Sequence, residues 1–132
     1  MTRALLFVLL SALVLFSCEQ ENDNEPKRSP SITYRTDSGY TYTDDTVGLG
    51  DTVRIGVTMQ KGSDDIAAFM VRVAYDGQSV YEQRDSIVVG AETFSFEKLI
   101  VTRNQPGSEK WMFGVEEIDG DAYFRPITLT VQ

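Results

Sequence analysis

Histidine is absent from this chain of 132 residues, and Cys18 is its only cysteine. Without an imidazole base, a serine or cysteine nucleophile lacks its usual activator, and zinc or copper sites built on histidine are excluded. A single thiol cannot form a disulfide within the chain, so a packed core must supply the stability of the fold. Paired acids remain as catalytic groups, but neighbouring residues on a strand point to opposite faces. We therefore predict that the chain is not an enzyme.

Basic residues are also scarce, because 12 lysines and arginines stand against 20 aspartates and glutamates, giving a formal charge of −8. Nucleic acids and anionic lipid surfaces both require a clustered basic surface on their protein partners. The composition therefore argues against nucleic acid as a partner.

The amino terminus carries a long apolar run. It covers the 13 residues 4–16, is interrupted only by Ser11 and follows the basic residue Arg3. A transmembrane helix needs roughly 20 apolar residues, whereas the core of a signal peptide has the shorter length seen here. We therefore expect residues 1–17 to be a cleaved signal peptide.

The end of this run, Leu15-Phe16-Ser17-Cys18, resembles a bacterial lipobox, with an aliphatic residue three positions before the cysteine and a small residue directly before it. The resemblance implies cleavage before Cys18, a diacylglycerol group on its sulfur and an acyl group on the new amino terminus. Several acyl chains hold a protein on a membrane much more firmly than one chain does. An ordinary secretory signal that ends near a cysteine by chance is the alternative.

Residues 18–30 follow as a polar segment without aromatic or aliphatic side chains. Such a segment buries too little apolar surface to offset the entropy of ordering, so we expect a flexible tether. Directly after Cys18 the segment carries four acids, Glu19, Glu21, Asp23 and Glu25. These acids resemble the acidic export signal of Bacteroidota-type surface lipoproteins, which implies an outer-membrane lipoprotein that faces the cell exterior. A linker that is merely soluble is the alternative.

Residues 31–132 are enough for one small domain with one core. Apolar residues alternate there with a period of two, most clearly over 51–60, and turn residues recur about every ten positions. Asp76-Gly77 and Asp119-Gly120 are hairpin signals. The alternation is weaker over residues 78–84 and is lost at residues 99–101, which predicts a bulge or a change of sheet near residues 97–98.

About seven short antiparallel strands, without an amphipathic helix, predict an all-β, immunoglobulin-like two-sheet antiparallel β-sandwich. Turns and strand ends stand out at four places, which are 50–53 (GDTV), 73–77 (VAYDG), 116–120 (EEIDG) and 127–131 (ITLTV). These segments resemble those of bacterial immunoglobulin-like modules. The resemblance covers roughly residues 31–132 and implies the fold, but no particular ligand.

Three tyrosines are candidate ligand contacts. Tyr40 and Tyr42 alternate with threonines and share one side of their segment. On an exposed face they would stack on sugar rings or anchor a protein partner, whereas on a buried face they would be core residues. Tyr81, close to the Asp76-Gly77 turn, is the aromatic that we expect to be most exposed, while Trp111 is expected in the core.

Acidic residues surround the second hairpin signal. Glu116, Asp119 and Asp121, beside Glu117, form a candidate calcium site, because hard cations prefer several oxygen ligands. The spacing matches no complete calcium loop, and aspartate and glycine are also what a tight turn requires. Apart from calcium, no cofactor is expected.

Together, these features predict a non-catalytic binding module, anchored at the bacterial outer membrane through lipid on Cys18 and contacting a glycan or a protein partner. The alternative is a structural accessory subunit of an outer-membrane assembly. A small aromatic-floored concavity would favour the first function, and a broad flat patch or an unprotected edge strand would favour the second.

Overall fold

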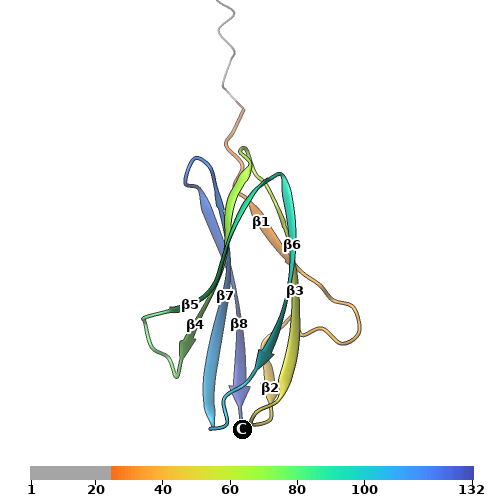
Figure 1. The fold of residues 1–132 in the computed structure, drawn as a ribbon, viewed down its shortest axis with the longest axis vertical. Coiled ribbons are helices and arrows are strands. Elements are labelled where there is room, and N and C mark those ends of the chain that lie inside the picture. Colours follow the sequence, from red (N-terminus) through yellow and green to blue (C-terminus); the bar gives the residue numbers. More distant parts are fainter. Residues whose placement is uncertain (1–24) are drawn as a thin grey trace, which may run out of the picture.

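The computed structural model describes residues 25–132, so the expected signal peptide, Cys18 and most of the expected tether lie outside the described residues. The described chain forms eight strands and no helix (Figure 1). None of its elements has the helical length and hydropathy that a membrane span requires. The strands are β1 (Ser31–Tyr34), β2 (Asp45–Val47), β3 (Thr52–Gln60), β4 (Ile66–Tyr75), β5 (Glu82–Ala91), β6 (Thr93–Val101), β7 (Gly107–Glu117) and β8 (Ala122–Val131).

The strands form two facing sheets, one with the order β1-β3-β6 and one with the order β2-β8-β7-β4-β5 (Figure 1). This confirms the all-β, two-sheet sandwich. Every neighbouring pair is antiparallel except β2 and β8, which are parallel, so the antiparallel prediction is wrong for that pair. The reason is that the chain passes from β1 to the other sheet without reversing its direction, and it therefore meets β8 running the same way.

The core lies between the sheets, where the inward residues of each strand meet. Strand β3 shows the predicted alternation, since Val53, Ile55, Val57 and Met59 are buried and their neighbours Arg54 and Thr58 are exposed. An aromatic cluster fills the space beside them, in which the fully buried Phe69 ring lies 4.8 Å from the Phe96 ring and 5.7 Å from the Phe94 ring. Trp111 is 5% exposed, which confirms its place in the core.

Strand β6 contradicts the prediction of a bulge or a change of sheet near residues 97–98. It pairs with β3 in one continuous register, from Val101 opposite Thr52 to Thr93 opposite Gln60. Lys98 takes an inward position instead, and its ammonium lies 2.7 Å from a carboxylate oxygen of Asp85 on β5. This ion pair bridges the sheets, and the unbroken register leaves Leu99 and Val101 exposed on the outer face.

The first hairpin signal corresponds to a real turn, although the loop is longer than two residues. Asp76 and Gly77 both have positive φ angles, of 51° and 73°, as a type I′ turn requires, and Gln78 N donates to Tyr75 O. Strand β5 begins only at Glu82, so residues 78–81 extend the connection.

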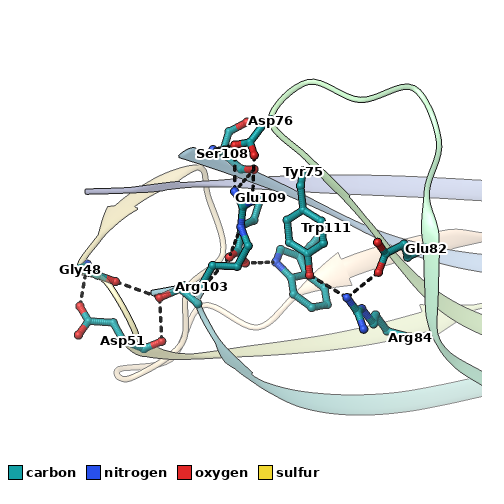
Figure 2. A network of polar contacts seen from close by, with 11 residues as sticks. Gly48, Asp51, Tyr75, Asp76, Glu82, Arg84, Arg103, Ser108, Glu109 and Trp111 are labelled. Atoms are coloured by element: carbon teal, nitrogen blue, oxygen red, sulfur yellow. Dashed lines mark hydrogen bonds and ion pairs between the residues drawn. The ribbon is translucent and has the colours of Figure 1, made fainter. Parts of the chain in front are cut away.

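A polar network closes the end of the sandwich that lies away from the amino-terminal segment (Figure 2). Its centre is Glu109, which is 1% exposed and accepts hydrogen bonds from Arg103 N at 2.8 Å and from Trp111 Nε1 at 3.1 Å. The Arg103 guanidinium donates to both carboxylate oxygens of Asp76 and lies 4.4 Å from the centre of the Tyr75 ring. Both oxygens of Glu109 are therefore satisfied, and the network joins the β6–β7 connection to the turn after β4.

Candidate ligand-binding surface

The loop between β1 and β2 folds back over the outer face of the three-stranded sheet. Backbone hydrogen bonds from Arg35 N to Gly56 O and from Thr41 N to Arg54 O, both 2.8 Å, attach it to β3 at two points. Between these points the chain turns at Gly39, whose φ angle of 89° is costly for any residue with a side chain. The loop is thereby held against the sheet, and Tyr40 lies over β3.

Tyr40 is fixed in this position by charged neighbours rather than by the core. Its hydroxyl donates to the carboxylate of Glu97, its ring centre lies 4.4 Å from the Arg35 guanidinium carbon, and the Arg54 guanidinium carbon is 5.7 Å away. The hydrogen bond to Glu97 raises the pKa of Tyr40. Gly56 makes this packing possible, because a Cβ there would lie 3.0 Å from the Tyr40 ring and from the Arg35 side chain. Tyr40 is thus a half-buried, preorganised aromatic on the outer surface.

An open concavity of about 400 Å³ lies beside this tyrosine on the same face of the sheet. Arg35 and Glu97 supply opposite charges to its wall, and the hydroxyls of Thr58 and Ser95, 3.3 Å apart, supply neutral donors and acceptors. Such a mixed lining suits a polar ligand with several hydroxyl or amide groups, which can both donate and accept hydrogen bonds.

The three tyrosines expected to contact a ligand do not form one surface. Tyr42 lies on the same loop as Tyr40 and is 45% exposed. Neither of these tyrosines lines the concavity itself, and Tyr40 adjoins it through its contacts with Arg35 and Glu97. Tyr81 belongs to the connection between β4 and β5, which lies on the opposite side of the sandwich from the β1–β2 loop (Figure 1). Tyr81 is also half-buried, and both Tyr42 and Tyr123 are more exposed than it is.

Sequence reasoning missed the residues that hold Tyr40. The alternation of β3 does place Arg54 on the polar face, which is a local signal for its exposure. Glu97, by contrast, is 57 positions away from Tyr40 in the chain, and only the pairing of β3 with β6 brings it near. No local pattern marks such a contact.

The acids around the second hairpin are arranged differently from the expectation. The alternation of β7 that buries Trp111 and Val115 also turns Glu117 inward, where it is 1% exposed, and leaves Glu116 half-buried on the outer face. Glu117 clusters with Asp119 and with Asp64 from the β3–β4 loop, and one carboxylate oxygen of each lies within 4.8 Å of the others. Of the three expected ligands, Glu116, Asp119 and Asp121, only Asp119 belongs to this acidic cluster.

Asp119 has two further partners that fix its position. The ammonium of Lys27 lies 2.6 Å from one of its carboxylate oxygens, and the other oxygen accepts a hydrogen bond of 3.0 Å from Asp121 N. The hydrogen bond from Lys27 lowers the pKa of the Asp119 carboxyl and raises that of the ammonium. The end of the expected tether therefore touches the acidic turn.

Comparison with known proteins gives structural similarity at low scores only. No family model and no curated protein sequence matches the chain. A superoxide reductase (neelaredoxin) from Ignicoccus hospitalis is 8% identical over 80% of this chain and 82% of its own, with a TM-score of 0.48. A CARDB domain from Pyrococcus furiosus is 12% identical over 82% of this chain and all of its own, also at 0.48. A beta-glucosidase from Listeria innocua is 11% identical over 78% of this chain but only 16% of its own, at 0.47.

Scores and identities this low assign no function, and the similar proteins themselves differ in activity. Any functional conclusion must therefore come from the residues of this chain.

Proposed function

We propose that this chain is a non-catalytic binding module, held at the bacterial outer membrane by lipid on Cys18 and facing the cell exterior, where it contacts a glycan or a protein partner. The observation that carries the binding role is the preorganised surface around Tyr40. An aromatic ring, a guanidinium and a carboxylate stand there beside an open concavity of about 400 Å³.

Preorganisation is what makes this surface suitable for binding. Free side chains must be ordered when a ligand arrives, at a cost of about 0.5–1.5 kcal/mol for each rotamer-rich side chain. Here Tyr40 is already held by Glu97 and Arg35, and Arg54 lies 3.4 Å from a Glu97 oxygen. A ligand that stacks on the ring or forms hydrogen bonds with its neighbours therefore binds side chains that the fold has already ordered, so it loses little free energy in ordering them.

The position of the amino-terminal segment is compatible with anchoring through Cys18. Arg28 N donates to Ser63 Oγ at 2.8 Å, and Ser63 N donates back to Arg28 O at 2.9 Å, so the segment enters at one end of the sandwich (Figure 1). Eight residues separate Cys18 from Lys27, a distance of at most about 30 Å. On this geometry the Tyr40 surface lies on the flank of the domain, clear of a membrane at the entry end.

One observation favours the second candidate, a structural accessory subunit of an outer-membrane assembly. Strand β6 is an edge of the three-stranded sheet, and its outward residues Leu99 and Val101 are 57% and 68% exposed. An exposed edge with apolar side chains is a typical place for another chain to pair. If another subunit paired with β6, assembly would not depend on the Tyr40 ring.

The two candidates are separated by binding measurements on the mature chain carrying Cys18→Ser, first against an array of bacterial and host glycans and then against envelope extracts. We expect Tyr40→Ala to weaken binding at least ten-fold, since truncation of a central aromatic hot spot typically costs about 2 kcal/mol or more. Tyr123→Ala, which removes an exposed tyrosine outside this surface, is the matched control.

Binding that survives Tyr40→Ala but is lost when Leu99 and Val101 are replaced by threonine would favour the subunit instead. In parallel, the native chain should sediment with membranes and the Cys18→Ser chain should not. A serine variant that still sediments with membranes would contradict lipid anchoring.

A further inference from the structure

Glu117 contains a buried carboxylate oxygen that the fold leaves unpaired. The residue ends β7 and is 1% exposed. One of its oxygens, Oε1, accepts a hydrogen bond from Gly62 N, while Oε2 has no hydrogen-bond partner within the part of the chain that the structure describes. A buried acceptor without a partner is rare in native proteins, and it commonly marks an ion or a water site.

Two further carboxylates converge on the same place from different parts of the chain. Asp64, on the β3–β4 loop, and Asp119, on the β7–β8 turn, each bring one carboxylate oxygen within 4.8 Å of a carboxylate oxygen of Glu117 and of each other. Two ligands of one calcium ion, each about 2.4 Å from it, are at most about 5 Å apart. The separation of the three oxygens is therefore compatible with a single shared ion.

The nearby lysines do not neutralise the buried oxygen. Lys27 pairs with Asp119 at 2.6 Å, and Lys61 pairs with Asp65 at 3.0 Å and with Glu92 at 2.6 Å. No ion pair to Glu117 forms among residues 25–132, so the cluster keeps an excess of negative charge next to an unpaired acceptor.

We propose that Asp64, Glu117 and Asp119 bind a calcium ion, with Glu117 Oε2 as the buried ligand. Calcium accepts oxygen ligands in irregular geometry, whereas magnesium demands a near-ideal octahedron and keeps most of its water. Zinc prefers nitrogen and sulfur ligands, which the cluster lacks. Lys27 competes with the ion for Asp119, so calcium binding weakens the contact between the amino-terminal segment and the turn.

Calorimetric titration and thermal unfolding of the mature Cys18→Ser chain test this proposal, with calcium chloride, magnesium chloride or EDTA. Sites of this kind in extracellular modules have dissociation constants of about 10⁻⁴–10⁻³ M. At 10 mM calcium, such affinity raises the Tm by about 7–14 °C relative to EDTA, and magnesium raises it less. Lys27→Gln is expected to tighten calcium binding several-fold, because the competing ammonium is gone.

Glu117→Gln is the decisive variant, and Glu116→Gln is its matched control from the adjacent, outward position. Glu117→Gln keeps an oxygen for Gly62 N but removes the buried charge, so calcium binding falls at least ten-fold while the Tm in EDTA stays the same or rises. Glu116→Gln leaves the calcium-induced rise in Tm unchanged. If Glu117→Gln does not fold, Asp64→Asn, at a half-buried position, must show the same loss.

Three results would overturn the proposal. The first is a wild-type Tm that calcium does not change. The second is a calcium shift that persists in Glu117→Gln, with a lowered Tm in EDTA, as a purely structural carboxylate predicts. The third is a loss of calcium binding in Glu116→Gln as large as that in Glu117→Gln, which would mean that calcium acts through general surface charge.

Discussion

Replacing Glu109 with glutamine is expected to lower the free energy of unfolding by about 2–4 kcal/mol. Glu109 is 1% exposed, and its carboxylate accepts hydrogen bonds from two donors, Arg103 N and Trp111 Nε1. Each of its two oxygens therefore has a hydrogen-bond partner. Glutamine has the same shape but only one oxygen, and its amide group must face one of the two donors. A buried donor left without an acceptor costs about 1–3 kcal/mol.

Electrostatics adds to this cost. The Nε atom of Arg103 lies 3.4 Å from a Glu109 oxygen, and the arginine side chain is 21% exposed. Removing the buried negative charge leaves Arg103 with Asp76 as its remaining carboxylate partner, so we add about 1 kcal/mol for a hydrogen-bonded, partly screened pair. In a domain of about 100 residues, a total of 2–4 kcal/mol lowers the Tm by about 10–20 °C.

The assay is urea unfolding followed by circular dichroism, with Glu82→Gln as control. Glu82 belongs to the same network, but its carboxylate is 58% exposed, so its replacement should change stability by less than about 0.5 kcal/mol. In a Trp111→Phe background, which removes the indole donor, Glu109→Gln should cost about 1–2 kcal/mol less than in the wild type. A Glu109→Gln protein within 0.5 kcal/mol of the wild type would refute this reasoning.

Two further predictions concern the core and the response to pH. Phe69→Ala should lower the free energy of unfolding by about 3–5 kcal/mol, because it opens a cavity beside two aromatic rings, whereas Val88→Ala, at a 91% exposed position, should change it by less than 0.5 kcal/mol in the same urea assay. The hydrogen bonds from Arg103 and from Ser108 N lower the pKa of Asp76 from 3.8 to about 2, so its contribution to stability is complete above about pH 4 and is lost as the pH falls towards 2. Asp76→Asn should therefore reduce the acid dependence of stability between pH 4 and 2, and an unchanged acid transition would contradict the pairing with Arg103.

The parts of the fold that sequence predicts well are those governed by neighbours along the chain. Alternation in β3 depends on residues two positions apart, and the Asp76-Gly77 turn depends on the backbone freedom of two residues. Alternation in β7 also predicts that two acidic residues are buried, which sequence reasoning missed. Trp111 and Val115 set the phase of β7, and this phase also turns Glu109 and Glu117 inward.

The interpretation of β6 was wrong because we predicted a bulge or a change of sheet from the unbroken apolar run at residues 99–101. Ile100 keeps the inward phase of Phe94 and Phe96, to which Lys98 also belongs, while its two apolar neighbours stay exposed on the outer face. An inward lysine is tolerated because Asp85 on another strand supplies its partner. The partner cannot be identified without knowing which strands face each other.

The candidate sites depend on contacts between distant parts of the chain, and these contacts were not predictable. Tyr40 contacts Glu97, which lies 57 positions away in the chain, and Asp64 on the β3–β4 loop lies close to Asp119 on the β7–β8 turn. The parallel pairing of β2 with β8 depends likewise on where the first segment changes sheets. Local patterns determined which side chains are polar or apolar, while the topology determined which of them meet.

Protease accessibility on intact cells of the native host tests the central claim most directly. The cells are treated before and after lysis, beside a known periplasmic protein, and the domain is then detected by blotting. A lipid-anchored module that binds partners outside the cell should disappear from intact cells while the periplasmic control survives. Survival of the domain until lysis would contradict exposure at the cell surface.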